Sequence, residues 1–551
     1  MAAKPFDRES EHSFELGLDE ADDDAALRAL VAKKLRVPEA ELPPVELKKR
    51  SIDARRGKVS FHVVVGFAEE EPTDLGAPNP IDVRPSPRVV IIGAGPAGLY
   101  CAYQLARSGI ASVIVERGKK VQPRRHDLAG MNQRGEVNPE SNYCFGEGGA
   151  GTYSDGKLYT RSHKRGDVRD VLEVLALHGA PSEILTDARP HIGSNRLPKV
   201  VTGMRERLES VGVEVLFEAR VVDLITTRRA GAKVVSGVRL ADGRELGADA
   251  VVVAGGHSAR DLHAMLERHG VTLEAKPFAL GVRIEHPQPL INRIQYGRHA
   301  GHPKLPSAAY KLAHTVEERG VFSFCMCPGG WVVPASTEEG ALVVNGMSLS
   351  RRDSPYANSG LVVSVELADL EALGLRGPRA GVELQARVEE AAWKAGGGAL
   401  VAPATRVTDF LDKRGSSTVP ASSYLPGVAS ADVAEVLDAS GLRFADRLRE
   451  ALRAFGRNLR GYVPDEAILI ATESRTSSPV RVPRDPETLE APELGGLYPC
   501  GEGAGYAGGI VSAALDGMRV ARAVEARLDQ PSASSSARAS ARPASGEGSP
   551  S

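Results

Sequence analysis

The fold of this 551-residue chain is decided by the stretch Val89-Val90-Ile91-Ile92-Gly93-Ala94-Gly95-Pro96-Ala97-Gly98. Four β-branched residues predict a buried strand, and the glycines that follow have the spacing G-x-G-x-x-G at the start of a helical pattern. Gly93 permits a tight turn, Gly95 lets backbone approach a phosphate, and Gly98 lets the helix pack on the strand. The free N–H groups at the start of the helix attract a pyrophosphate, so we expect a Rossmann-like dinucleotide site.

The residues after this stretch complete a strand–helix–strand unit. The helical pattern covers residues 96–108, and a second apolar strand is expected over 112–116. It ends in Glu116, about 20 residues after the glycines, where a carboxylate can accept the hydroxyls of an adenosine ribose. Both NAD and FAD use this half-site, so the rest of the chain has to distinguish them.

A second glycine-rich segment near the end of the chain favours FAD. It runs from Gly496 to Gly505, contains the acid Glu502, and is followed by Gly508-Gly509 and a helical pattern over 510–523. The acid can bind the ribityl hydroxyls, and the helix start stabilises negative charge on a reduced flavin ring by about 0.3–1 kcal/mol. The alternating run 233–240 and the strand 250–253, which ends in Ala254-Gly255-Gly256, are typical of the β-meander and return strand of flavoenzymes similar to glutathione reductase. An NAD dehydrogenase has no use for the second segment.

A separate NAD(P)H domain is not expected, because no second G-x-G-x-x-G lies in its own strand–helix–strand frame. NAD(P)H stays open as a transient electron donor or acceptor that binds in the substrate cleft.

Length and composition bound the class of protein. With 42% hydrophobic residues, 25% charged residues and a formal net charge of −2, the chain has the make-up of a globular protein of two or three domains. This balance does not support a nucleic-acid or anionic-membrane partner. Five cysteines are sparse and odd in number, which fits a reducing cytoplasm better than a disulfide framework. Neither an apolar signal core nor a run long enough for a transmembrane helix is found.

Pattern and composition predict an α/β protein in five parts. Residues 1–80 are expected to form a small ferredoxin-like α+β domain with the order strand–helix–strand–strand, ending in a proline-rich linker between Pro72 and Pro87. Residues 88–265 and 466–529 are the two parts of a Rossmann-like FAD-binding domain, and residues 266–465 are an inserted α+β substrate domain. The serine-rich tail 530–551 has almost nothing to bury and is expected to be disordered.

Five long motifs resemble those of the uncharacterised FAD-dependent dehydrogenase family of bacteria. They are the runs Asn142 to Leu158, Gly281 to Pro287, Phe324 to Gly330, Glu473 to Arg481 and Gly501 to Ile510. The similarity covers nearly all of residues 12–525. It implies a glutathione-reductase-type FAD domain, an inserted substrate domain and a small N-terminal α+β domain, but it supplies no substrate. In the wider flavoprotein pattern the late acid is usually Asp, whereas this chain has Glu502.

The residues expected to contact the cofactor follow from the two glycine segments, the return strand and these motifs. They are Gly93, Gly95, Pro96, Ala97, Gly98, Glu116, Arg117, Gly149, Gly151, Val222, Ala254, Gly255, Gly501, Glu502, Gly508, Gly509 and Ile510. Flavin itself carries the hydride chemistry, so the protein has to position a substrate and manage protons. The glycine-rich loop from Gly148 to Lys157 either brings Ser154 or Lys157 near the reactive flavin N5 or is a plain surface turn.

Two groups of residues in the inserted part suggest further chemistry. Arg283 and His286 end an alternating run, and His286 is the best general acid–base candidate because histidine titrates near neutrality. His257, after the return strand, could face the cofactor instead, and a structural role is open for both histidines. Cys325 and Cys327 invite a redox or metal interpretation. Two thiols fall short of a zinc site and a disulfide across one residue is strained, so we favour buried small hydrophobic residues.

Charged clusters give two further hypotheses. Arg475 belongs to a group with Glu473, Arg481, Arg484 and Asp485 on the approach to the late glycine segment. Because arginine recognises carboxylates, this group favours an anionic substrate, and a structural ion-pair network is the equal alternative. The basic run from Lys48 to Lys58 could touch RNA, a protein or a phosphate, but a solvated hairpin is the default interpretation.

The sequence therefore predicts an FAD-dependent oxidoreductase, a dehydrogenase that moves a hydride between flavin N5 and a small anionic organic substrate under the inserted domain. The catalytic candidates are Ser154, Lys157, Arg283, His286 and Arg475, and no metal is expected. The alternative is a flavin-binding sensory module that uses the basic N-terminal domain to bind RNA or a protein. Substrate, direction, electron partner and oligomeric state are not determined by the sequence.

Overall fold

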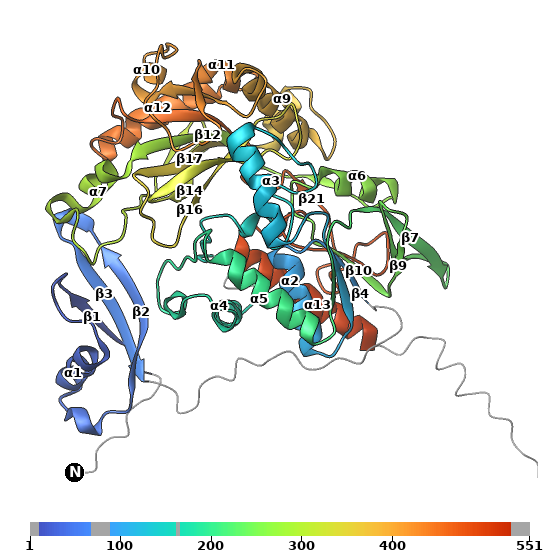
Figure 1. Cartoon of the computed structure of the whole chain (residues 1–551), viewed down its shortest axis with the longest axis horizontal. Coiled ribbons are helices and arrows are strands. Elements are labelled where there is room, and N and C mark those ends of the chain that lie inside the picture. The colour runs from blue at the N-terminus through green and yellow to red at the C-terminus, as the bar shows by residue number, and fades with distance from the viewer. Residues whose placement is uncertain (1–9, 68–88, 161–165, 530–551) are drawn as a thin grey trace, which may run out of the picture.

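The computed structural model describes residues 10–67, 89–160 and 166–529. The predicted proline-rich linker and the predicted disordered tail lie outside the described residues. The chain forms a small N-terminal unit, a unit built on a parallel sheet, and a unit built on a larger mixed sheet that is inserted into the second one (Figure 1).

The N-terminal unit packs one helix on a three-stranded antiparallel sheet. Its elements are β1 (His12–Leu16), α1 (Asp24–Leu35), β2 (Val45–Asp53) and β3 (Ser60–Phe67), with strand order β1-β3-β2. Asp23 caps α1 by accepting a hydrogen bond from the N–H of Ala26. The predicted element order is confirmed. A ferredoxin-like fold has a second strand–helix–strand half, which residues 10–67 do not contain, so that part of the prediction is not met here.

The second unit is a five-stranded parallel sheet in the order β22-β10-β4-β5-β6. Its strands are β4 (Val89–Ile92), β5 (Ser112–Val115), β6 (Glu214–Leu216), β10 (Ala250–Val253) and β22 (Leu497–Pro499). The central strands are wholly buried, which explains their continuous apolar runs. Helices α2 (Pro96–Arg107), α5 (Leu197–Ser210) and α13 (Ile510–Asp529) pack together on one side.

This topology brings the two glycine segments together. β22 lies beside β10, and β10 lies beside β4, all running in the same direction. The carboxyl ends of the three strands therefore meet at one edge, where α2 and α13 begin. Open α/β sheets bind ligands at such an edge. The antiparallel meander β7 (Val221–Arg229), β8 (Ala232–Leu240) and β9 (Glu245–Gly247) leads into the return strand β10, as predicted.

The inserted unit is a seven-stranded sheet in the order β13-β14-β17-β12-β20-β18-β19. Its strands are β12 (Phe278–Pro287), β13 (Ala313–Val316), β14 (Arg319–Cys327), β17 (Tyr356–Val365), β18 (Ala402–Arg406), β19 (Val428–Ser430) and β20 (Ile468–Glu473). Because β20 pairs with β12 and β18, the sheet continues past the predicted boundary at residue 465. A separate hairpin of β15 (Gly330–Pro334) and β16 (Val344–Ser348) contacts the parallel-sheet unit, where Ser348 bonds Asp155 and Ser194.

The other elements complete the three units. The helices are α3 (Val121–Arg134), α4 (Val168–Leu177), α6 (Arg260–Arg268), α7 (Gln288–Tyr296), α8 (Leu367–Ala372), α9 (Ala380–Ala395), α10 (Val407–Leu411), α11 (Val433–Asp438) and α12 (Phe444–Asn458), and the short strands β11 (Glu274–Ala275) and β21 (Val480–Arg481) pair with each other. None of the helices in the described ranges is long and apolar enough to cross a membrane.

Candidate functional site

A cavity of about 760 Å³ lies where the strand ends of the parallel sheet meet the inserted unit. Its volume is within the range of about 300–1,000 Å³ that is usual for ligand pockets. One side, here called the glycine wall, consists of Gly93, Gly95, Gly149, Gly255 and Gly508 with their neighbours. The other side, here called the inserted wall, consists of Phe324, Cys325, Asn345, Arg475 and Thr476.

The first glycine turn has the geometry that its spacing predicts. Gly93 has φ +105°, and a Cβ there would lie 2.7 Å from the carbonyl oxygen of Ala254. A Cβ on Gly98 would lie 2.0 Å from the carbonyl oxygen of Gly93, so α2 can pack this closely only because residue 98 is glycine. Gly95 is the N-cap of α2 and provides no side chain to bond the first N–H groups. The helix start is therefore free to bind an anion.

Glu116 lies in the cavity lining directly after β5. One oxygen of its carboxylate accepts a hydrogen bond of 2.9 Å from the N–H of Ala94. The other accepts bonds of 2.9 and 3.0 Å from the N–H groups of Gly118 and Gly146. The carboxylate thus ties the glycine turn to two later segments while it faces the space where a ribose is expected.

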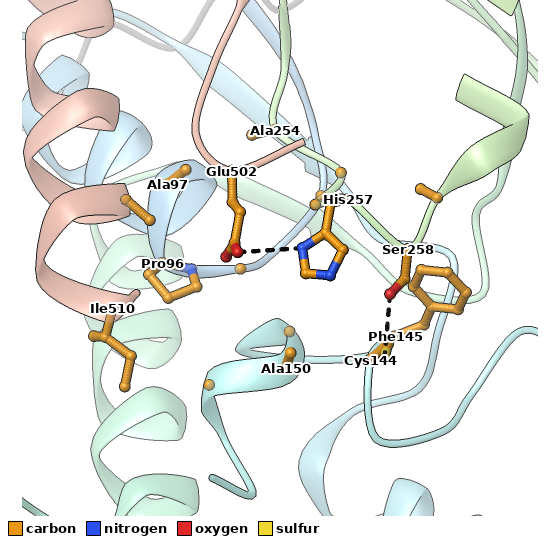
Figure 2. A pocket seen from close by; sticks show the side chains of 18 of the residues that line it. Pro96, Ala97, Cys144, Phe145, Ala150, Ala254, His257, Ser258, Glu502 and Ile510 are labelled. Atoms are coloured by element: carbon orange, nitrogen blue, oxygen red, sulfur yellow. Dashed lines mark hydrogen bonds and ion pairs between the residues drawn. The ribbon is translucent and has the colours of Figure 1, made fainter. Parts of the chain in front are cut away.

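The second glycine segment opens on the same cavity. A Cβ on Gly508 or Gly509 would have no protein atom within 4 Å, so both positions face open space at the start of α13. Figure 2 shows Glu502 and His257 directed toward each other beside Ala97, with Nδ1 of His257 3.3 Å from Oε1 of Glu502. His257 therefore faces the cavity on the side of the glycine wall, as the alternative interpretation of the sequence expected.

Most of the predicted cofactor residues line this one cavity. They are Gly93, Gly95, Pro96, Ala97, Glu116, Arg117, Gly149, Gly151, Ala254, Gly255, Glu502, Gly508, Gly509 and Ile510. Gly98 and Gly501 lie behind the lining instead. A Cβ on Gly501 would lie 2.8 Å from that of Ala97, so this glycine lets the late segment approach α2.

The prediction of Val222 is corrected by one residue. Val221, not Val222, lines the cavity. Successive side chains of a strand point to opposite faces, so a shift of one position in β7 turns the side chain away from the site.

Ser154 and Lys157 both line the cavity, so the loop that carries them is not a plain surface turn. The hydroxyl of Ser154 donates a hydrogen bond of 2.8 Å to the carbonyl oxygen of Gly151. Nζ of Lys157 lies 3.2 Å from Oδ2 of Asp155 and contacts the sulfurs of Cys325 and Cys327. Although burial opposes it, these sulfurs and Asp155 raise the pKa of Lys157 above its ordinary value.

Arg283 lies behind the inserted wall rather than in the cavity lining. Its side chain is completely buried, and its Nε donates a hydrogen bond of 2.9 Å to Oε2 of the equally buried Glu473. Nη2 donates to the carbonyl oxygen of Cys325 at 3.1 Å. Burial raises the pKa of Glu473 to about 7, although Arg283 acts in the opposite direction. The structure thus assigns Arg283 to shaping the backbone at Cys325 and not to direct substrate contact.

The structure does not support His286 as the general acid–base. The side chain is buried in the core of the inserted unit, where it meets Tyr310 edge-on and packs at a tilt against Tyr462. Its Nε2 is 2.8 Å from the carbonyl oxygen of Tyr462. Burial lowers the pKa of His286 to about 4, so the ring is neutral near pH 7. The sequence pattern missed this because both faces of β12 are buried and no residue of this strand lines the cavity.

Arg475 lines the cavity, but its guanidinium is held in an ion pair. It donates hydrogen bonds of 3.1 and 3.0 Å to the two carboxylate oxygens of Glu389, and one of 2.8 Å to the hydroxyl of Thr337. Although burial opposes it, the charges of Arg475 and Arg260 lower the pKa of Glu389 to about 2. The contacts therefore favour the structural ion-pair alternative for this arginine.

Several residues of the lining had no signal in the sequence. Cys144 and Phe145 belong to a quoted motif but carried no expected role, and Asn345 comes from β16 with no motif around it. Cys144 accepts a hydrogen bond from the hydroxyl of Ser258 at 3.5 Å (Figure 2). Cys325 also lines the cavity, whereas Cys327 is fully buried, so the preference for two buried hydrophobic residues holds for only one of them.

The basic run of the N-terminal unit is largely neutralised by carboxylates. Lys48 pairs with Glu46, Arg50 with Asp22, Arg55 with Asp53, and Lys58 with Glu15. The charges are those of a solvated hairpin, and no observation in the described residues favours an RNA-binding surface.

Three families match successive parts of the chain. A domain of unknown function (DUF8436) matches residues 9–68, the FAD binding domain matches residues 87–134, and the FAD-dependent protein, C-terminal domain-like, matches residues 277–476. The chain is also 40% identical over 545 residues to an uncharacterised protein of Clostridium beijerinckii. That alignment covers 94% of this chain and 99% of the relative.

The solved structures that match the chain are much more distant. The flavin-dependent brominase Bmp2 is 14% identical, with 81% of this chain and 80% of that chain covered and a TM-score of 0.35. The tetracycline destructase Tet(55) is 11% identical, with 83% and 85% covered and a TM-score of 0.34. CtdE, solved in complex with FAD, is 11% identical, with 80% and 88% covered and a TM-score of 0.29. Likenesses of this degree do not establish a shared activity.

Proposed function

The chain belongs to an uncharacterised family of FAD-dependent proteins, and from this premise we propose that it is an oxidoreductase that acts on a small anionic organic substrate. The bound FAD supplies the redox chemistry, which we propose to be a dehydrogenase reaction in which a hydride passes between flavin N5 and the substrate. The observation that carries the proposal is that the glycine wall and the inserted wall border the same cavity. A cofactor held by the first is thereby exposed to whatever the second binds.

The residues present fit the cofactor. The open N-terminus of α2 at Gly95 suits the pyrophosphate, and Glu116 is placed for the adenosine ribose. Gly508 and Gly509 leave space at the start of α13, where the helix dipole favours negative charge on the flavin. Each of these features is backbone or a single acid.

An anionic substrate is supported by the charge balance around Lys157. Asp155 is shared between Lys157 and Arg352, whose Nη2 lies 2.6 Å from Oδ2 of Asp155. Two cations thus face one buried carboxylate, and the group has one net positive charge. Since Lys157 lines the cavity, that charge is directed at the ligand. By contrast, Arg475 and Arg260 share Glu389, and both also lie near Glu338. These two arginines therefore add little net positive charge to the cavity.

An anaerobic screen tests the proposal. The visible absorption of the FAD-loaded protein is recorded while small anionic metabolites, NADH and NADPH are added one at a time. We expect one compound to bleach the flavin band, and replacement of Lys157 by Met to weaken its binding about tenfold with normal FAD content. A colourless protein that takes up no FAD on reconstitution would refute the proposal of an FAD-dependent oxidoreductase. A flavin that is bleached only by neutral compounds, equally well in the Lys157→Met variant, would refute the anionic class.

A further inference from the structure

Two cysteines and one lysine form a cluster at the inserted wall. Nζ of Lys157 lies 3.7 Å from Sγ of Cys325 and 3.5 Å from Sγ of Cys327. The two sulfurs therefore share one ammonium group, although their residues are only two apart. Cys325 lines the cavity, whereas the Cys327 side chain is buried behind it.

The backbone is distorted where the cysteines meet the lysine. The pairing of β14 with β17 shifts between Phe324 and Cys327, and Cys325 adopts φ +45°, a left-handed conformation that is rare for a residue other than glycine. Arg283 supports this conformation through its hydrogen bond to the carbonyl oxygen of Cys325. Strain of this kind persists only where the surroundings enforce it, and it concentrates at functional sites.

The charges around Cys325 favour a thiolate. The groups that face it are Lys157, Arg283, Asp155, Glu473 and Cys327. Arg352 bonds Asp155 as well, so three cations face two carboxylates, and the one surplus positive charge favours either a thiolate at Cys325 or an anion bound in the cavity beside Lys157. A hydrogen bond from Cys327, followed by the charges of Lys157 and Arg283, lowers the pKa of Cys325 well below its ordinary value. Thiolates next to a lysine or arginine are the reactive cysteines of proteins.

We propose that Cys325 and Cys327 are a redox-active thiol pair whose substrate is a small disulfide, with Cys325 as the attacking thiolate and Cys327 as the resolving thiol. This inference assigns to the cavity of the proposed oxidoreductase a second reaction, a thiol–disulfide exchange without hydride transfer, and rests on the proposed function only for the place of that reaction. It also replaces the view of the two cysteines as inert hydrophobic residues.

The proposed exchange is balanced in atoms and electrons. Sγ of Cys325 attacks one substrate sulfur, the substrate S–S bond breaks, and the first thiolate leaves with a proton from Lys157. Cys327 returns a proton to Lys157 and attacks Sγ of Cys325, which forms the Cys325–Cys327 bond and releases the second thiolate, protonated by solvent. The substrate gains two electrons and the pair loses two. A dithiol reductant restores the pair by the reverse exchange, and the strain of a disulfide across one residue makes it easy to reduce.

Alkylation of the full-length protein tests the attacking thiolate. Iodoacetamide labelling is followed by mass spectrometry with and without FAD, and Cys144, which is half-buried in the same cavity, is the internal control. We expect Cys325 to react at least about tenfold faster than Cys144 at pH 7, with a rate nearly constant from pH 6 to 8. In Lys157→Met the rate at pH 7 should fall about tenfold and rise with pH, whereas Lys157→Arg should retain most of it. Equal labelling of the two cysteines in the wild type would overturn the proposal.

Oxidised glutathione tests the resolving thiol. The wild type should release reduced glutathione and lose two hydrogens from the peptide that contains Cys325 and Cys327. Cys327→Ser, with Cys327→Ala as a second variant, should instead accumulate glutathione on Cys325, and Cys325→Ser should do neither. Absence of both the internal disulfide and the trapped adduct would refute the proposal that Cys325 and Cys327 are a redox-active pair. If the pair is inert but another metabolite bleaches the flavin, the inference fails and the proposed function stands. If the cysteine pair reacts in a protein that binds no FAD, the inference stands and the proposed function fails.

Discussion

The glycine wall and the inserted wall border the same cavity but are built in different ways. The glycine wall consists of backbone from short segments, in which the position of each glycine follows from its neighbours: Gly93 must turn, Gly98 must pack and Gly95 must leave an opening. The inserted wall consists of side chains that converge from distant parts of the chain, such as Cys325, Asn345 and Arg475, and Lys157 contacts it from the loop of the parallel-sheet unit. The comparison shows that a local sequence pattern can encode a cofactor-binding site. A substrate-facing surface of side chains from distant segments forms only when the whole fold is assembled.

The largest expected effect concerns the ion pair of the inserted wall. Arg475→Met leaves the buried Glu389 with one arginine fewer, and breaking a buried pair of this kind costs about 3 kcal/mol or more. We expect a clear fall in the urea midpoint with retained FAD content. Arg319→Met is a matched control, because it breaks a similar two-bond pair with Asp369 at a partly exposed site and should cost about 1 kcal/mol at most. Unchanged stability in Arg475→Met, together with lost turnover, would instead place this arginine on the substrate.

The next effect concerns the core behind the inserted wall. His286 has a pKa of about 4 in the folded chain and 6.5 as its ordinary value, so the unfolded chain binds a proton that the folded chain does not. The contribution of the lowered His286 pKa to the free energy of unfolding is therefore complete above pH 6.5 and is lost as the pH falls toward 4. This contribution amounts to about 3 kcal/mol. Urea unfolding at several pH values should show that the free-energy difference between wild type and His286→Gln shrinks by this amount. The variant should keep its turnover at neutral pH, and loss of turnover in a stable variant would restore His286 as a catalyst.

A smaller effect tests the glycine wall without disturbing the fold. A Cβ on Gly95 would meet no protein atom closer than Cα of Gly149, at 4.0 Å, so Gly95→Ala places a methyl group in the open cavity. We expect FAD affinity to fall about 100-fold, or about 2.7 kcal/mol, while the stability of the FAD-free protein changes by less than about 1 kcal/mol. Gly247→Ala is the control, because its Cβ would also be unhindered but lies in β9, outside the cavity lining. Equal FAD affinity in both variants would show that the pyrophosphate does not bind at Gly95.

The smallest effect concerns the acid of the second glycine segment. Glu502 is partly exposed and its contact with His257 is 3.3 Å, so the pair is screened by solvent. Glu502→Gln keeps an oxygen acceptor for the ribityl hydroxyls and should weaken FAD binding less than about fivefold, or about 1 kcal/mol. Fluorescence titration with FAD measures this change. A loss of more than 100-fold would mean that the negative charge itself is required, and the glycine wall would then depend on a side-chain charge as the inserted wall does.

The two walls also differ in how well the sequence predicted them. Nearly all the predicted cofactor residues line the cavity, and each of the three exceptions lies close in sequence to a residue that does. Val222 is displaced by one strand position, and Gly98 and Gly501 act in packing behind the lining. Of the predicted catalytic residues, Ser154, Lys157 and Arg475 line the cavity, whereas His286 lies in the core, and the prediction gave the two cysteines no chemical role. The period-2 pattern of β12 could not show that both of its faces are buried and that neither lines the cavity, because that depends on what packs against each side.

By itself the sequence determined that the chain turns tightly after β4, begins a helix with open N–H groups and ends a second strand in an acid, because a short run of residues sets its own φ, ψ and hydrogen-bond donors. Only the tertiary structure decided that Lys157 would meet Cys325 and Cys327, that Arg475 would be held by Glu389, and that His286 would be enclosed by tyrosines. These contacts join residues up to 176 positions apart. Their energies depend on distance and burial in space, and separation along the chain specifies neither.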